Sequence, residues 1–140
     1  MNKLKFSYQF DEMDCGPACF RMIASTFGIQ LSSAEVKNNS YILKTGISLL
    51  GLQEVAKHFG LDSIALFLTT NDLITNKSSV PCILHWQHNH YVVLSKITQN
   101  RITKKYKFHI ADPAHGFIKL SLNDFEKSWL SSDGGGAAMF

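Results

Sequence analysis

The sequence predicts an α+β fold, in which a helical N-terminal half packs on an antiparallel β-sheet built by the C-terminal half. Two observations carry this prediction. In the first half, apolar residues recur every three or four positions, which is the spacing of one helix face. In the second half, short apolar or alternating runs are separated by turn residues, which is typical of strands.

Size and composition indicate a single globular domain over residues 1–140, because the chain is 45% hydrophobic and 18% charged. The net charge is +3, and its one concentrated run is interpreted as a solvated strand edge rather than a nucleic-acid site: Lys104, Lys105 and Lys107. No apolar run is long enough to span a membrane, and the N-terminus is too polar for a secretory signal. Three cysteines, an odd number, indicate free thiols in a reducing compartment.

Three helices are expected in the first half. Pro17 suits the first turn of the first helix, and Gly28 suits its end. The apolar face of that helix comprises Ala18, Cys19, Met22, Ile23 and Phe27. Ser32 and Glu35 form a capping-box pair ahead of a short second helix. Ser48 caps a third helix that ends at Gly60, with a buried stripe of Leu49, Leu52, Val55, Ala56 and Phe59.

Strands dominate the second half. They are expected at 61–68, 80–86, 90–98, 104–111 and 117–120. The turn at 99–101 favours an antiparallel hairpin, and short helices are expected near 71–76 and 122–130. The tail GGGAAMF is expected to form a turn and a short last strand, although its glycine content argues against that strand.

The stretch DEMDCGPACF at 11–20 places Cys15 at the start of the first helix. The helix dipole and free N–H groups there lower the pKa of a thiol. Gly16 leaves access to the sulfur open, and Asp14 is expected to cap the helix. Cys19 and Cys82, by contrast, are interpreted as small buried apolar residues.

A nucleophilic cysteine needs a base, and His90 stands at the mouth of the apolar run YVVL. A ring there is equally consistent with a core histidine and with a site residue. If 90–98 and 104–111 form a hairpin, the start of the first strand meets the end of the second. Asp112 would then neighbour His90 and orient its ring, although an Asp-Pro turn is the simpler reason for this acid. Gln9, six residues before Cys15, could donate to an oxyanion.

The segment HWQHNH at 85–90 offers a weaker alternative, a metal site. On a strand, His88 and His90 share a face, whereas His85 points the other way. A fourth ligand is not evident, so no metal site is predicted.

These motifs together resemble the bacteriocin-processing cysteine peptidase domain of peptidase-containing ABC transporters. The resemblance rests on the run from Gln9 to Cys19, on TGISLLGL at 45–52, on HWQHNHYVVL at 85–94 and on ADPAHG at 111–116. It implies a papain-like fold in which Cys15 is the nucleophile, His90 the general base and acid, Asp112 the orienting group and Gln9 an oxyanion-hole donor.

The resemblance also implies that the domain removes a leader peptide after a Gly-Gly pair, for export by the attached transporter. The partners would be the leader peptide and the transmembrane and nucleotide-binding domains of that transporter, with no nucleic acid. No cofactor is expected in this domain, whereas ATP and Mg would serve the attached transporter. The expected location is the cytoplasmic face of the bacterial plasma membrane, with the isolated domain soluble.

Two other functions stay open at this point. A peptidase-like module without turnover could bind export substrates, although the presence of Cys15 argues against it. A metal or redox protein could use Cys15, Cys19 and the histidines. The cargo peptide, the leader-reading residues and the oligomeric state do not follow from the sequence.

Overall fold

The fold is described from a computed structural model, which places residues 3–11, 14–38, 47–76, 80–87 and 90–140. The helices are α1 (Cys15–Thr26), α2 (Ser33–Asn38), α3 (Leu49–His58), α4 (Thr70–Thr75) and α5 (Leu122–Trp129). The strands are β1 (Ala65–Leu68), β2 (Cys82–Trp86), β3 (His90–Gln99), β4 (Tyr106–Asp112), β5 (Gly116–Ser121) and β6 (Gly136–Met139). The predicted α+β class, with helices before the sheet, is confirmed.

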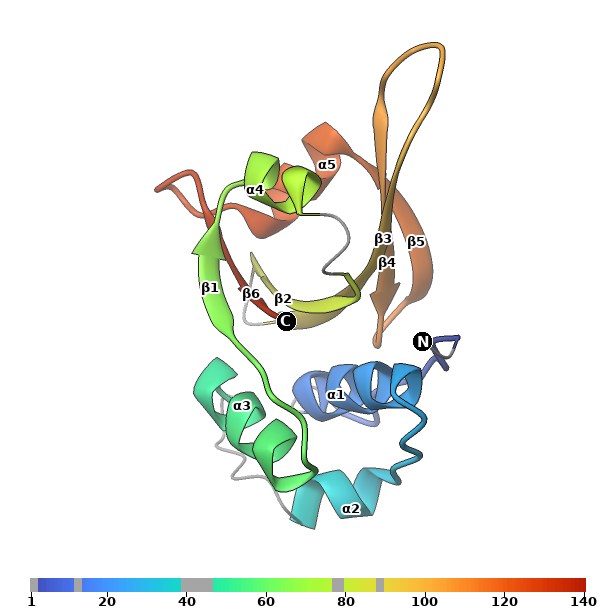
Figure 1. Cartoon of the computed structure of the whole chain (residues 1–140), viewed down its shortest axis with the longest axis vertical. Helices are drawn as coiled ribbons and strands as arrows, with labels where there is room; N and C mark the ends of the chain where they lie inside the picture. Colours follow the sequence, from blue (N-terminus) through green and yellow to red (C-terminus); the bar gives the residue numbers. More distant parts are fainter. Residues whose placement is uncertain (1–2, 12–13, 39–46, 77–79, 88–89) are drawn as a thin grey trace.

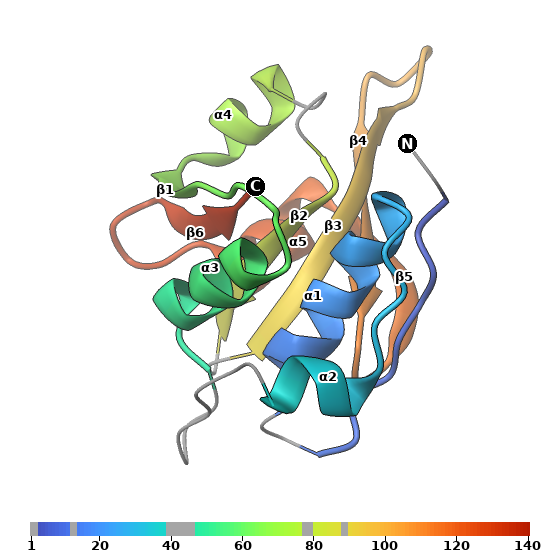
Figure 2. The same cartoon turned by 60° about the horizontal axis from the view of Figure 1, so that its bottom comes forward.

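The strands form one curved antiparallel sheet in the order β1-β6-β2-β3-β4-β5. Helices α1, α2 and α3 gather on one side of the sheet, and α4 and α5 lie on the other (Figure 1). Helix α1 runs along β3, and α2 lies across the outer side of α1 (Figure 2). The molecule therefore has three layers, and the central strands are covered on both faces.

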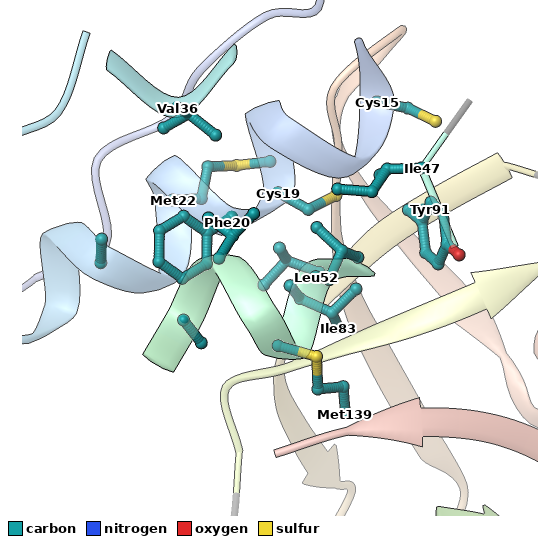
Figure 3. Close-up of a cluster of buried hydrophobic side chains, with 14 of the residues drawn as sticks. Cys15, Cys19, Phe20, Met22, Val36, Ile47, Leu52, Ile83, Tyr91 and Met139 are labelled. Atoms are coloured by element: carbon teal, nitrogen blue, oxygen red, sulfur yellow. The ribbon is translucent and has the colours of Figure 1, made fainter. Parts of the chain in front are cut away.

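The alternation of side chains along the central strands explains this layering. Along β2 and β3, Ile83, Tyr91 and Val93 belong to the cluster under α1 to α3, which Figure 3 shows in part. Their neighbours Leu84 and Val92 belong to the cluster under α4 and α5. Successive strand residues point to opposite faces, so a strand covered on both sides reads as an unbroken apolar run. The runs PCILHW and YVVL have this character.

The predicted helix ends are confirmed where a side chain caps the helix or a glycine terminates it. Ser48 accepts a hydrogen bond from the backbone N–H of Gly51 at 3.0 Å. Ser32 and Glu35 exchange side-chain and backbone hydrogen bonds at 3.1 and 3.2 Å, as a capping box requires. Gly28 has a φ of 78°, a conformation that favours glycine and closes α1.

Two expectations about the fold need correction. The strand expected at 61–68 is only Ala65–Leu68, because the N–H of Leu61 still bonds the last turn of α3 through the carbonyl of Ala56. Phe27 is 57% exposed rather than buried, since it lies past the end of α1. The short last strand expected in the tail is confirmed despite its glycine content, and it lies inside the sheet between β1 and β2.

Two different constraints explain the glycines at positions 134 and 136 of the tail. Gly134 has a φ of 80° and makes the turn before β6. A Cβ on Gly136 would overlap the indole ring of Trp129, which packs directly on the backbone there. The run is therefore a turn followed by a close approach between a strand and a tryptophan, and it is compatible with a buried strand.

Candidate active site

Cys15 is the first residue of α1 and is 4% exposed. Figure 3 shows it at the rim of the cluster, near Ile47 and Tyr91, whereas Cys19 lies one turn further into the core. The positive end of the helix dipole favours negative charge at this position. The predicted placement of Cys15 at a helix start is therefore confirmed.

Gly16 has a different role from the one expected. A Cβ built on Gly16 would overlap Ile47 and come within 3.5 Å of Leu52 and of Tyr91. The glycine therefore lets the first turn of α1 approach α3 and β3 closely. Its contribution is to packing beneath the thiol rather than to access above it.

Asp14 does not cap α1, which corrects the expectation from the sequence: its side chain makes no cap hydrogen bond. Instead, the fully buried carboxylate accepts from the backbone N–H of Phe10 at 2.9 Å. Arg21 and Lys37 place cationic nitrogens 3.9 and 3.7 Å from its two oxygens. These two cations compensate a buried negative charge that would otherwise be costly so close to Cys15.

His90 and Asp112 come together as the hairpin geometry predicted. Nε2 of His90 lies 2.7 Å from Oδ1 of Asp112, across the β3–β4 pair. Asp112 is 4% exposed, and its Oδ1 also accepts from the backbone N–H of Ala114 at 2.9 Å. His90 also interacts with the side chain of Cys15, and this interaction helps to raise the pKa of the imidazole. The thiol, the imidazole and the carboxylate thus form one chain of interacting groups.

The charges of this chain stabilise one another. Burial alone would lower the pKa of His90, but hydrogen bonds with Asp112 and Cys15 and the charges of both residues outweigh it and raise that pKa to about 9. Burial would raise the pKa of Asp112, but hydrogen bonds from His90, Ala114 and His115 together with the charge of His90 lower it. Asp112 is therefore a carboxylate at neutral pH, and His90 is positively charged.

The ionised carboxylate also fixes which ring nitrogen of His90 serves the thiol. A carboxylate can only accept, so Nε2 of His90 carries the proton that lies between His90 and Asp112. Nδ1 is the nitrogen left for Cys15. While His90 is positively charged, Nδ1 holds a proton that it can give to a leaving group, and only the neutral ring can take a proton at Nδ1.

Gln9 lies in the N-terminal segment, where hydrogen bonds on both sides hold its loop. Its backbone N–H donates to the carbonyl of Pro113, next to Asp112, at 2.9 Å. The N–H of the following residue, Phe10, is held by Asp14, next to Cys15. The segment that carries Gln9 is thus hydrogen-bonded both to the start of α1 and to the end of β4.

Among the residues that the structure describes, the side-chain amide of Gln9 uses one of its two N–H donors. Nε2 donates to the carbonyl of Asp11 at 3.0 Å, which leaves its second N–H for another acceptor. The buried Oε1 has no hydrogen-bond partner in the described chain. If the amide were flipped, Oε1 of Gln9 would face the carbonyl oxygen of Asp11, and two acceptors cannot form a hydrogen bond. The bond to Asp11 therefore fixes the orientation of the amide.

The remaining cysteines are unsuited to nucleophilic chemistry, as predicted. All three cysteines are free and buried. Burial, with smaller contributions from the charges of Cys15 and Asp112, raises the pKa of Cys19 well above its usual value. Burial alone does the same to Cys82. Both thiols therefore remain protonated.

The other histidines take separate places. His85 stacks on Tyr91, His109 bonds the hydroxyl of Thr98, and His58 ends α3. His88, part of the alternative metal site, lies outside the described residues. Within the described ranges no group of three or more His, Cys, Asp or Glu side chains is arranged to hold a metal ion.

Sequence reasoning missed three residues at this site. His115 bonds the free oxygen of Asp112, and Arg21 and Lys37 surround Asp14. The motif DPAHG offered a signal for His115, because a residue three positions after an aspartate in a turn can reach back to it. Arg21 and Lys37 come from two different helices, so nothing in the sequence pointed to them.

Residues 3–132 of the sequence match the model of the peptidase C39 family. The sequence is 32% identical over 120 residues to the colicin V secretion/processing ATP-binding protein CvaB of Escherichia coli, a match that covers 86% of this chain and 16% of that protein. It is 30% identical over 129 residues to the lactococcin-G-processing and transport ATP-binding protein LagD of Lactococcus lactis, covering 89% and 18%.

The fold is similar to solved peptidase domains. The crystal structure of the peptidase domain of Streptococcus ComA, a bi-functional ABC transporter, superposes with a TM-score of 0.83 at 26% identity, over 99% of this chain and 97% of that one. A double glycine motif protease from an AMS/PCAT transporter, solved with its leader peptide, gives a TM-score of 0.82 at 22% identity, over 99% and 90%. This second likeness bears on the fold alone.

Proposed function

The chain belongs to the peptidase C39 family, and from this premise we propose that it is a cysteine endopeptidase that cleaves the leader of bacteriocin-type precursors after a Gly-Gly pair. Family membership and the ComA likeness make the fold papain-like. The observation that carries the proposal is the chain of interacting groups from Cys15 at the start of α1 through His90 to Asp112, in which His90 and Asp112 are joined by a hydrogen bond of 2.7 Å.

Each residue of that chain supplies one part of the reaction. The sulfur of Cys15 attacks the carbonyl carbon of the second glycine, and His90 holds the proton of the thiol at Nδ1. The oxyanion that forms accepts from Gln9 and from the backbone N–H of Cys15. His90 then protonates the leaving amine as the C–N bond breaks. Water, deprotonated by His90, hydrolyses the thioester and restores the thiol.

The wider protein is part of the proposal, because the chain spans only 14% to 18% of the length of the curated relatives it matches. We expect the domain to act beside the transmembrane and nucleotide-binding domains of an ABC transporter, where ATP and Mg serve those domains and no cofactor serves this one. This assigns it to the cytoplasmic face of the plasma membrane. No helix in the described ranges is both long and apolar enough to cross a bilayer.

The proposal is tested by incubating a synthetic precursor, consisting of a leader ending in Gly-Gly and a few further residues, with the protein and analysing the products by mass spectrometry. Wild type should cut after the second glycine, and Cys15→Ala should not. Cys19→Ala is the matched control, since it removes a neighbouring thiol that stays protonated. It should retain cleavage.

A second arm replaces either glycine of the precursor by valine. Cleavage should disappear, because a Gly-Gly requirement implies a cleft too narrow for a Cβ branch. Cleavage of the valine precursors would contradict the Gly-Gly specificity. Binding of the leader without cleavage by wild type would instead favour the non-catalytic docking module.

A further inference from the structure

Asp112 contacts two histidines rather than one. Oδ1 of the carboxylate lies 2.7 Å from Nε2 of His90, and Oδ2 lies 3.1 Å from Nδ1 of His115. His115 follows Asp112 by three residues in the turn between β4 and β5, where its backbone N–H also bonds the carbonyl of Asp112 at 3.1 Å. The side chain of His115 is 75% exposed, whereas that of Asp112 is 6% exposed.

The ionisation of Asp112 determines which ring nitrogen of His115 carries a proton. Because the pKa of Asp112 is lowered, its carboxylate accepts from both rings, so Nδ1 of His115 carries a proton. The hydrogen bond from His115 is itself one of the causes that lower that pKa. His115 therefore donates to the carboxylate from the side opposite His90 and leaves its own Nε2 to solvent.

The two carboxylate oxygens are held unequally. Oδ1 accepts from His90 and from the N–H of Ala114. Oδ2 accepts only from His115 among the residues that the structure describes. Rotation of the carboxylate about the Cβ–Cγ bond would carry Oδ1 away from its two donors and Oδ2 away from His115, so the bond from His115 adds a third restraint on the carboxylate plane. That plane determines how well Oδ1 lines up with the N–H of His90.

We propose that His115 is a positioning residue for the peptidase reaction, which holds the plane of the Asp112 carboxylate so that Asp112 keeps the His90 ring aligned with Cys15. This rests on the proposed function. His115 acts through Asp112 and needs no contact with the substrate, so it affects the rate of the chemical step and leaves substrate binding unchanged.

Two replacements that differ only in the reach of one amide group test the proposal. In His115→Asn, the side-chain NH₂ stands where Nδ1 stood. In His115→Gln, it stands one bond further out, at the place of Nε2. The asparagine variant should keep the wild-type kcat. The glutamine variant and His115→Ala should lose about 3- to 10-fold in kcat with KM unchanged, the value of one hydrogen bond to a partly screened charge.

His58→Gln controls for the loss of an exposed imidazole elsewhere, at the end of α3, and should be indistinguishable from wild type. Because His115 is largely exposed, its variants are expected to fold, and a circular dichroism melt of each checks this. Equal kcat for His115→Asn and His115→Gln would overturn the proposal. So would a change confined to KM.

A readout independent of turnover separates this proposal from the peptidase assignment. The proton on Nε2 of His90 can be followed by NMR in ¹⁵N-labelled protein. Its resonance should be the same in wild type and His115→Asn, and should shift or broaden in His115→Gln and His115→Ala. If wild type cuts no precursor but the resonance behaves in this way, the positioning role stands and the peptidase function fails. An unchanged resonance in all variants would overturn the positioning role.

Discussion

At the scale of single residues, two buried carboxylates flank the reactive centre with opposite effects on it. Asp112 bonds His90 directly and favours its positive charge. Asp14 stands beside Cys15, where a negative charge would oppose a thiolate, and Arg21 and Lys37 offset it. One acid therefore bonds the imidazole of His90, and the other holds the loop that carries Gln9.

The pH dependence of cleavage should report the Asp112–His90 pair. The leaving amine needs a protonated imidazole, so kcat/KM should fall on the alkaline side with an apparent pKa of about 9, the value for His90. Asp112→Asn removes the carboxylate charge that helps to raise this pKa. The alkaline limb should therefore move to lower pH in that variant.

The measurement is kcat/KM of wild type and Asp112→Asn from neutral to strongly alkaline pH. The sign follows from the cause, since losing a negative neighbour destabilises the imidazolium and lowers its pKa. An alkaline limb that stays in place in Asp112→Asn would show that the carboxylate does not set the ionisation of His90.

At the scale of elements, glycines mark the places where one element packs on the backbone of another. Gly16 lets α1 approach Ile47, and Gly136 lets β6 approach Trp129 of α5. Neither has an unusual backbone conformation, unlike Gly28, Gly60 and Gly134. The reason for glycine at these two positions is therefore space, and only the packed structure reveals it.

Gly136→Ala should lower the free energy of unfolding by about 1 to 3 kcal/mol, the usual cost of forcing an extra carbon into a filled core. Urea denaturation of the variant measures this. Trp129→Leu in the same background should relieve the overlap, so the double variant should be more stable than the sum of the single losses predicts. Strict additivity of the two changes would refute the packing explanation.

At the scale of the whole molecule, the site exists only where the helical layer meets the sheet. Cys15 belongs to α1, whereas His90 and Asp112 belong to β3 and β4. The packing of α1 on β3 and the pairing of β3 with β4 bring the three together. The last strand, β6, completes the sheet by pairing with both β1 and β2.

A chain shortened to end at Gly135 should not fold cooperatively. It would lose β6, and with it the strand that joins β1 to the rest of the sheet. Ala138 and Met139, buried in the two opposite core clusters, would be lost as well. Circular dichroism during urea denaturation checks this. A sharp two-state transition near that of the full chain would show that the sheet does not depend on β6.

The sequence predicted the elements whose signals are local. Ser48, the Ser32–Glu35 pair and Gly28 identify helix ends because a cap is made within one turn of chain. It also predicted the meeting of His90 with Asp112, because the start of one strand of an antiparallel hairpin lies beside the end of the other, and this holds although the register of β3 and β4 shifts between Leu94 and Lys96. It was wrong about the cap of α1 and about Phe27, where distant partners or the end of the helix decided the outcome.

By itself, then, the sequence determined the α+β class, the helix start that carries Cys15 and the hairpin that joins His90 to Asp112. Only the tertiary structure decided why Asp14 can be buried next to Cys15, why a glycine-rich tail is an inner strand of the sheet, and that His115 shares the carboxylate of Asp112. The physical reason is the separation along the chain of the residues that interact. Caps and hairpins depend on neighbours in the chain, whereas charge compensation and close packing depend on residues that meet only after folding.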